Sequence, residues 1–429
     1  MKRPRALICV VALFSLCCIV KSGEFRLLSL DRAGTMTWAN ALVPGVCTVE
    51  IAPSAAGQWQ PVKSVFTTNP FGFLTLAPSA GSSFYRLLAV DISGTPAGYS
   101  NLCASYSTLR TIAGKGEIGE DGFNAWEARF EGGLAIDAEL SRPHMAVADD
   151  AGNVYIADKD AHAIRKVTPA GRIFTVAGMN EPGDDGDAPG PATQRHLASP
   201  NGLWARGDGT LYILDTDNDK VRKVGTNGVL STLFEVKGGI EAGRGLWVSD
   251  DETLAYVAAG NAVKRWTPSG GVKTFEDGFK ELGNLTVDFT GHVVVTDRAD
   301  NRVYRLSNNG NKTVIAGKGE TSGGGDGALA KDTALHGVRG IWFLPNSGYF
   351  LATHEGSQIW YVDTSGIIHL FLDGERNAHA GDGEHFKTPG LKVSEVRAIT
   401  MDKQGNILIT ENDAGFIRKI DFLRRPAGN

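Results

Sequence analysis

Basic and polar side chains recur at one equivalent position in each of six similar segments between residues 143 and 423. In chain order, this position holds His144, Asn201, Arg244, Gly283, Arg339 and Arg397. Three guanidinium groups brought together could bind an anion, because a guanidinium matches a carboxylate or a phosphate with two parallel hydrogen bonds. The alternative is structural, with each arginine paired to a nearby carboxylate such as Asp158, Glu395 or Glu411.

A second equivalent position falls where the second predicted strand of each segment ends. It holds Asp158, Asp215, Ala259, Asp297, His354 and Glu411. Together, the polar and charged members of the two sets are the candidate ligand-binding residues: His144, Asn201, Arg244, Arg339, Arg397, Asp158, Asp215, Asp297, His354 and Glu411.

Glycine-rich acidic loops suggest a second chemistry. They read GEDG (119–122), GDDGD (183–187), GGGDG (323–327) and AGDGE (380–384). Carboxylates and glycine carbonyls suit calcium, but no loop has the alternating ligand spacing of an EF-hand. An aspartate before a short helix also fits a cap. The sequence therefore assigns no metal site and no cofactor, with a divalent metal such as calcium or zinc as the alternative.

Catalytic motifs are weak in this chain. The nine histidines are scattered, no H-x-x-x-H pair occurs, and no nucleophile elbow is present. We therefore assign no catalytic residue and favour a protein without enzymatic activity.

The elements that would position these residues are short strands. Each segment has runs rich in Val, Ile, Leu and Tyr separated by Gly, Asp and Asn turns, which predicts a four-stranded meander. A period near 40 residues is typical of a propeller blade. The sixth segment lacks its outer strand. Residues 107–114 (STLRTIAG) resemble the sequence of the outer strands in the other segments, so we expect them to supply this strand and close the ring.

The repeat text is specific. GNVYIAD (152–158), followed by IRKV (164–167) and loops of the type G-x-G-D-G, resembles the NHL-repeat family of six-bladed β-propellers over about residues 105–423. Related six-bladed folds include metal-dependent lactonases and lyases with ligands at the channel mouth. The resemblance therefore implies, as an alternative, a hydrolase, lactonase or lyase with a metal at the channel mouth.

Long insertions separate some blades. They cover residues 114–142, 178–199, 317–337 and 374–394, and in a closed ring they precede four consecutive blades. Connections from an outer strand to the next inner strand emerge on the face where the inner strands begin. We therefore expect a wall or lid over half of the face that carries the channel mouth.

The N-terminal third divides into two parts. Lys2, Arg3 and Arg5 precede an apolar run over 6–20, which predicts a signal peptide at 1–22 rather than a membrane anchor, because a spanning helix needs about 20 apolar residues. Residues 23–104 predict a small β-sandwich-like domain and linker, similar to those that precede catalytic or binding domains in exported bacterial proteins. Cys47 and Cys103 remain after cleavage, and we expect them to form a disulfide.

Overall charge narrows the possible partners. A formal net charge of −5 gives no reason to expect a nucleic acid. The sequence predicts an all-β, secreted or periplasmic (or cell-surface) protein, which we expect to be a monomer without a transmembrane segment. The predicted function is that of a binding or scaffold protein, with a partner protein or small anionic ligand held on the lidded face.

Overall fold

The computed structural model describes residues 25–422, except residues 32, 77–82, 118–119, 121, 242 and 346–347, together with the backbone of β1 (Cys9–Val10). The expected signal peptide, residues 1–22, lies outside the described residues apart from β1. That pair of residues runs parallel to β7 (Phe84–Asp91). No helix in the described part of the chain is long and apolar enough to cross a membrane.

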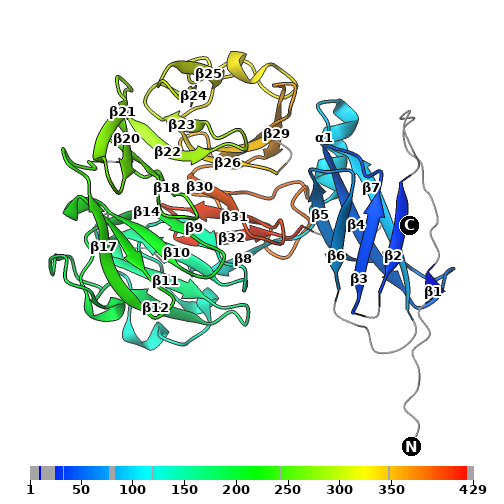
Figure 1. The fold of residues 1–429 in the computed structure, drawn as a ribbon, viewed down its shortest axis with the longest axis horizontal. Helices are drawn as coiled ribbons and strands as arrows, with labels where there is room; N and C mark the ends of the chain where they lie inside the picture. The colour runs from blue at the N-terminus through cyan, green and yellow to red at the C-terminus, as the bar shows by residue number, and fades with distance from the viewer. Residues whose placement is uncertain are drawn as a thin grey trace, which may run out of the picture.

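Six sheets of consecutive antiparallel strands form a ring (Figure 1). The first three sheets, from inner to outer strand, are β9 (Pro143–Ala148), β10 (Val154–Asp158), β11 (Ala163–Val167) and β12 (Ile173–Ala177); β14 (Pro200–Ala205), β15 (Leu211–Asp215), β16 (Lys220–Val224), β17 (Val229–Glu235) and the short β13 (Gly190–Pro191); and β18 (Leu246–Val248), β19 (Ala255–Ala259), β20 (Ala262–Thr267) and β21 (Gly271–Glu276).

The remaining three sheets follow the same order. They are β22 (Leu282–Val287), β23 (Val293–Asp297), β24 (Arg302–Leu306) and β25 (Lys312–Ala316); β26 (Val338–Phe343), β27 (Tyr349–Thr353), β28 (Gln358–Val362) and β29 (Ile368–Leu372); and β30 (Val396–Met401), β31 (Ile407–Glu411), β32 (Phe416–Ile420) and β8 (Leu109–Ala113). The inner strands β9, β14, β18, β22, β26 and β30 contact one another in that order, and β30 contacts β9. The expected all-β propeller is therefore confirmed.

The ring closes by joining the two ends of this part of the chain. β8 pairs antiparallel with β32, with Ala113 opposite Ile417 and Leu109 opposite Ile420. The N-terminal strand is thus the outer strand of the last sheet, which gives the edge of β32 a hydrogen-bonding partner.

Tight hairpins set the repeat length. After β9, Asp149 Oδ1 accepts a hydrogen bond from the Asn153 amide at 2.8 Å, and Gly152 between them has a φ of 82°. After β30, Asp402 accepts from the Asn406 amide at 2.9 Å. The Asp and Gly residues of the repeat therefore form a turn in which the glycine adopts a positive φ.

The long insertions lie along the outer strands of the blades that they precede. Each makes backbone pairs or carboxylate hydrogen bonds there: Leu134 with Arg172 on the first sheet, β13 with β17 on the second, Leu329 with Ile367 on the fifth, and Thr108 with His385 on the sixth. This corrects the expectation of a lid, because the insertions shield sheet edges that would otherwise be open. Among the described residues that line the polar cavity at the mouth, the insertions contribute Gly122, Arg142 and Ser199.

Two small sheets precede the ring. One has the order β2 (Arg26–Leu30), β3 (Thr35–Ala39) and β6 (Gly72–Thr75); the other has β1, β7, β4 (Gly45–Ala52) and β5 (Gln60–Thr67). Helix α1 (Pro96–Ala104) follows, and Thr95 Oγ1 caps it by accepting from the Gly98 amide at 3.0 Å.

The predicted disulfide between Cys47 and Cys103 is wrong, because both cysteines are free. Successive side chains of a strand point to opposite faces. Val46 of β4 packs in the cluster that includes α1, whereas Cys47 points into the separate core between the two small sheets, with Met36 and Trp38. Cys103 packs on the α1 side.

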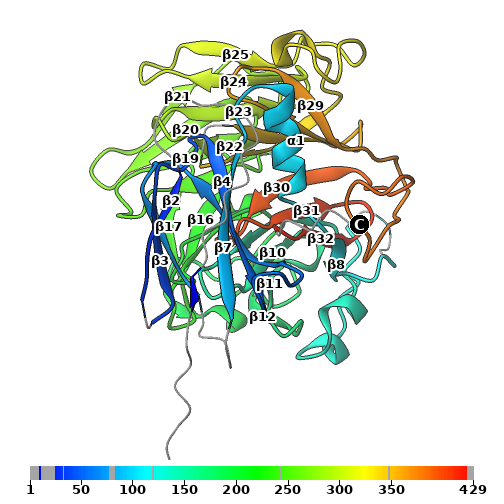
Figure 2. The same cartoon turned by 90° about the vertical axis from the view of Figure 1, so that its right-hand side faces the viewer.

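One apolar cluster joins the small sheets to the ring. Val46 and Ile92 pack with Tyr106, and this group continues into Phe350 and Phe422 of the propeller. The rings of Phe66 and Phe422 stack at 4.7 Å. Figure 2 shows α1 beside β29. Shared burial on this scale fixes the small sheets against the fifth and sixth blades.

Candidate functional site

A polar cavity of about 590 Å³ lies where inner strands of the ring begin. Four residues predicted for the mouth line it: His144, Asn201, Arg244 and Arg397. The other lining residues are Gly122, Arg142, Lys159, Ser199, Thr216, Asp217, Glu241, Asn412 and Asp413.

The additional residues come mainly from one repeated loop. Lys159, Thr216 and Asp413 each follow shortly after the end of the second strand of a blade. Glu355 and Arg298 occupy the same loop in the fifth and fourth blades. These loops have the sequences DKDA, DTDN, DRAD, HEGS and ENDA. Their position in the repeat could have predicted that they reach the mouth, because they emerge on the same face as the starts of the inner strands.

Arg244 is the unusual cation of the mouth. Its Nε and Nη1 atoms are buried and have no hydrogen-bond partner among the described residues. Burial lowers the pKa of Arg244 well below its ordinary value, and repulsion by Arg397, Arg339 and Arg298 lowers it further. The side chain is partly exposed, and no carboxylate of the described residues forms an ion pair with it, so its guanidinium group can accept a partner from outside the fold.

The neighbouring arginines are partly compensated. Arg339 donates from Nη2 to Glu355 at 2.8 Å, and Arg397 Nη2 lies 3.5 Å from Asp413. Burial and repulsion by Arg339 nevertheless lower the pKa of Arg397 to about 9. Both side chains also keep a buried Nε without a partner in the described chain.

Carboxylates beside these arginines stay ionised. Burial acts to raise the pKa of Asp413, but contacts with His354 and Arg397 hold it well below its usual range. Glu355 is likewise held low, against its burial, by His354 and Arg339. The mouth therefore combines several fixed charges of both signs, with Arg244 left over.

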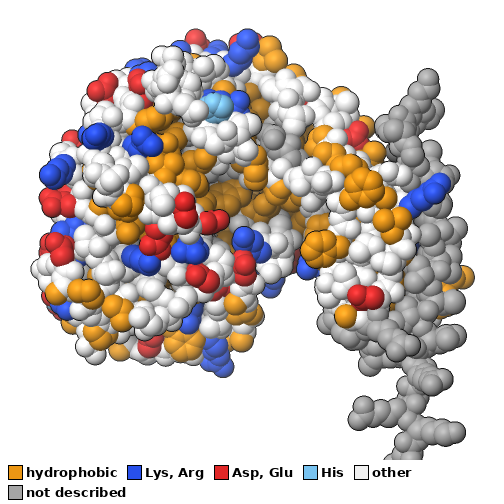
Figure 3. All heavy atoms as spheres, viewed as in Figure 1, with side chains coloured by type: hydrophobic (Ala, Val, Ile, Leu, Met, Phe, Trp, Pro, Cys, Tyr) orange, Lys and Arg blue, Asp and Glu red, His pale blue; other side chains and the backbone are white. Residues whose placement is uncertain are grey.

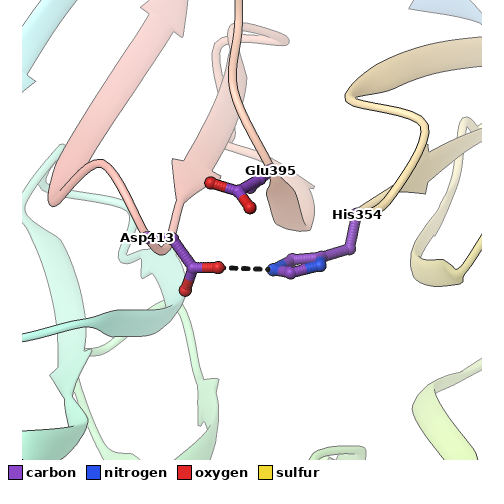
Figure 4. Close-up of side chains that lie close together, drawn as sticks. All are labelled: His354, Glu395 and Asp413. Carbon is purple, nitrogen blue, oxygen red and sulfur yellow. Dashed lines mark ion pairs between the residues drawn. The ribbon is translucent and has the colours of Figure 1, made fainter. Parts of the chain in front are cut away.

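Three mouth residues could hold a metal by proximity. His354, Glu395 and Asp413 offer ligand atoms within 4.8 Å of one another, and His354 Nε2 lies 3.2 Å from Asp413 (Figure 4). Glu395, however, accepts from Arg376 Nη2 at 2.6 Å, and Asp413 accepts from Arg142 at 2.9 Å. A divalent cation here would meet surrounding guanidinium groups, so the charges fit a metal poorly.

His144 is held neutral at the cavity. Burial lowers its pKa well below the ordinary range, and repulsion by Arg397 and Arg244 acts in the same direction. Its Nδ1 atom is buried and has no hydrogen-bond partner within the described residues.

The four predicted carboxylates lie outside the cavity. Asp158, Asp215 and Glu411 are 0% exposed, and each contacts a buried arginine seven residues later: Arg165 at 3.0 Å, Arg222 at 2.8 Å and Arg418 at 3.3 Å. Each also accepts a backbone N–H from the segment before the inner strand of its own blade. Asp297 accepts from the backbone of Lys280 and Glu281 instead. These carboxylates brace the blades and are not available to a ligand.

Side chains from opposite blades meet at the centre of the ring. Asn284 Nδ2 lies 3.7 Å from Met145 Sδ. At the far ends of the inner strands, the ring of Trp204 lies 6.0 Å from Trp342 and 6.3 Å from Trp247. Figure 3 shows one face of the ring hollowed at its centre, with hydrophobic side chains around the hollow. A ligand of the polar cavity would therefore enter from the arginine side.

Comparisons with known proteins support the fold alone. No protein-family model matches the sequence. The solved structure of a protein of unknown function from Bacteroides thetaiotaomicron is 13% identical with a TM-score of 0.59, covering 94% of this chain and 99% of that one. An auxiliary nutrient binding protein from the same species is 12% identical with a TM-score of 0.54, covering 91% and 94%.

Two curated proteins have similar segments. Teneurin-m of Drosophila melanogaster is 24% identical over 314 residues, which are 65% of this chain. Protein SUPPRESSOR OF QUENCHING 1, chloroplastic, of Arabidopsis thaliana is 30% identical over 97 residues, or 22% of this chain. The matches span 10% and 9% of the lengths of those proteins.

Proposed function

We propose that the protein is exported and binds a small anionic ligand at the mouth of an NHL-type propeller, without catalysis. In this proposal residues 1–22 are a signal peptide, residues 23–104 are a supporting module, and residues 105–429 are the propeller. The observation that carries the proposal is Arg244, a partly exposed cation on the wall of a polar cavity, whose buried Nε and Nη1 atoms have no hydrogen-bond partner among the described residues.

A bound anion would compensate the positive charge of Arg244, which has no carboxylate partner of its own among the described residues. Arg397 and Arg244 both line the cavity, and each lowers the pKa of the nearby His144 by repulsion. A bound carboxylate or phosphate would accept hydrogen bonds from both guanidinium groups and relieve their mutual repulsion. The similarity to an auxiliary nutrient binding protein is compatible with this role.

A metal-dependent hydrolase or lyase is the second candidate, on the observation that His354, Glu395 and Asp413 lie together. Elemental analysis of dialysed protein separates the two proposals. Stoichiometric zinc or calcium would favour the enzyme, whereas the binding protein should hold neither in stoichiometric amounts.

Calorimetric titration tests the anion directly. We expect inorganic phosphate or a simple carboxylate to bind the wild-type protein at low ionic strength, and Arg244→Gln to abolish binding. The control is Arg172→Gln, a change on the outer edge of the first blade. Absence of any response to either anion in the wild-type protein would reject the proposed function.

A further inference from the structure

The cavity also contains acceptors that a carboxylate cannot satisfy. Oδ1 of Asn412 is buried and has no hydrogen-bond partner among the described residues. Its amide orientation is set, because Nδ2 donates to the Pro143 carbonyl at 2.9 Å. Oδ1 of Asn201 is also buried and meets no donor in hydrogen-bond geometry within the described chain, although the Asn201 side chain lies close enough to His144 to act on the pKa of that residue. Both residues line the same cavity as Arg244.

A third acceptor is provided by His144. Its imidazole is neutral, so one ring nitrogen carries a proton and the other accepts. The cavity wall therefore presents guanidinium donors together with acceptors from two amides and an imidazole. A carboxylate supplies only acceptors, so on its own it would leave Asn201 and Asn412 unsatisfied.

The complementary ligand must carry donors beside its anionic group. Asp217, Glu241 and Asp413 also line the cavity, but beside His144 an ammonium group would meet Arg397 and Arg244, which already repel a proton on that side chain. Hydroxyl groups donate hydrogen bonds without adding charge. A volume of about 590 Å³ lies within the ordinary range of small-ligand sites, roughly 300–1,000 Å³.

We infer that the ligand is a hydroxylated carboxylate of the acidic-sugar class. Its carboxylate binds Arg244 and Arg397, and its hydroxyl groups donate to Asn201, Asn412 and His144. This inference rests on the proposed anion site and adds the requirement for hydroxyl donors.

Titration calorimetry of the full-length protein with four probes tests the inference: glucuronate, glucose, cyclohexanecarboxylate and inorganic phosphate. Glucuronate and cyclohexanecarboxylate present a carboxylate on six-membered rings, and only glucuronate adds hydroxyl groups. We expect glucuronate to bind at least about tenfold more tightly than cyclohexanecarboxylate, since one satisfied buried acceptor contributes about that factor. Glucose, which lacks the carboxylate, should bind most weakly of the three ring compounds.

Variants locate the effect. Asn201→Ala should lower glucuronate affinity about tenfold and leave cyclohexanecarboxylate affinity unchanged, whereas Asn227→Ala, in an exposed turn, should change neither. Equal affinities for the two acids, or no effect of Asn201→Ala on glucuronate, would overturn the acidic-sugar inference while leaving the anion site standing. Failure of both acids and of phosphate to bind would reject the anion site itself. Unchanged melting temperatures show that the variants fold.

Discussion

Arginine side chains in this protein differ in whether a carboxylate lies within reach. Arg165, Arg222 and Arg418 are among its most completely buried side chains, and each has a buried carboxylate on the preceding strand of its own sheet. Arg244 lies just before the inner strand β18, where the carboxylates of neighbouring blades already pair with other arginines. The same residue type is therefore a brace in one position and a candidate ligand anchor in the other.

The brace can be tested by substitution. Arg165→Met should lower the free energy of unfolding by about 3–5 kcal/mol, because it leaves Asp158 buried and unpaired. Lys166→Met on the same strand is the control and should cost much less. Urea unfolding measures both. A loss below about 1 kcal/mol for Arg165→Met would mean that the buried pair does not hold the blade.

The sequence pattern placed the residues of the cavity correctly more often than it placed the carboxylates that pair with buried arginines. His144, Asn201, Arg244 and Arg397 were predicted from their register and do line the cavity. The carboxylates at the ends of the second strands share an equally good register, but the sequence does not reveal that an arginine seven residues later lies on the adjacent strand beside them. Their burial follows from pairing across the sheet, which a list of positions does not contain.

At the scale of elements, the long insertions run along the outer strands of the blades and cover their edges. Glu131 accepts from Thr175, Asp187 from Thr232, and Asp382 from the Thr111 amide, so three of the insertions are tied to outer strands by carboxylates. The sequence predicted the lengths of the insertions, because the repeat spacing makes them visible. It could not predict their direction, since a loop that leaves an outer strand can turn toward the mouth or along the edge.

One such insertion gives a pH dependence. His379 stacks on Phe416 at 3.8 Å and lies 3.4 Å from Glu411 and 3.7 Å from Asp382. Burial acts to lower its pKa, but the hydrogen bonds with Asp382 and Glu411 outweigh burial and raise it above 6.5. A raised folded-state pKa contributes stability that is complete below the unfolded pKa and is lost as pH rises through the folded pKa.

We therefore expect the melting temperature of the wild-type protein to fall relative to that of His379→Gln as the pH rises from about 6 upward. Thermal melts across pH 5.5–9 measure the difference. His336→Gln, at an exposed position, is the control and should leave the pH profile unchanged. A wild-type profile parallel to that of His379→Gln would contradict the assigned contacts.

At the scale of the whole molecule, one strand holds both the ring and the link to the small sheets. Leu109 of β8 is 0% exposed, pairs with Ile420, and belongs to the apolar cluster that continues into Val46 and Ile92. The repeat text predicted the closing strand because its letters match those of other outer strands. It gave no indication that the small sheets share the core of the fifth and sixth blades, since packing between distant segments leaves no local pattern.

Closure of the ring by β8 predicts that a substitution at Leu109 strongly lowers the stability of the protein. Leu109→Ala should destabilise the protein by about 2–5 kcal/mol and expose the edge of β32 to proteolysis. The neighbouring Arg110 forms a half-exposed ion pair with Asp421, so Arg110→Ala should cost less than about 1 kcal/mol. Equal, small effects of the two substitutions would show that β8 does not hold the ring.

The central claim is that Arg244 at the mouth is not compensated within the fold and binds an external anion. Thermal unfolding of ligand-free protein at low ionic strength tests it, with Arg244→Gln compared with Arg339→Gln. Arg339 has an internal partner, Glu355 at 2.8 Å, so Arg339→Gln should lower the melting temperature. Arg244→Gln removes repulsion and breaks no contact recorded among the described residues, so its melting temperature should equal or exceed that of the wild-type protein. A loss of stability in Arg244→Gln as large as that in Arg339→Gln would contradict the account, because it would show that the fold already compensates this charge.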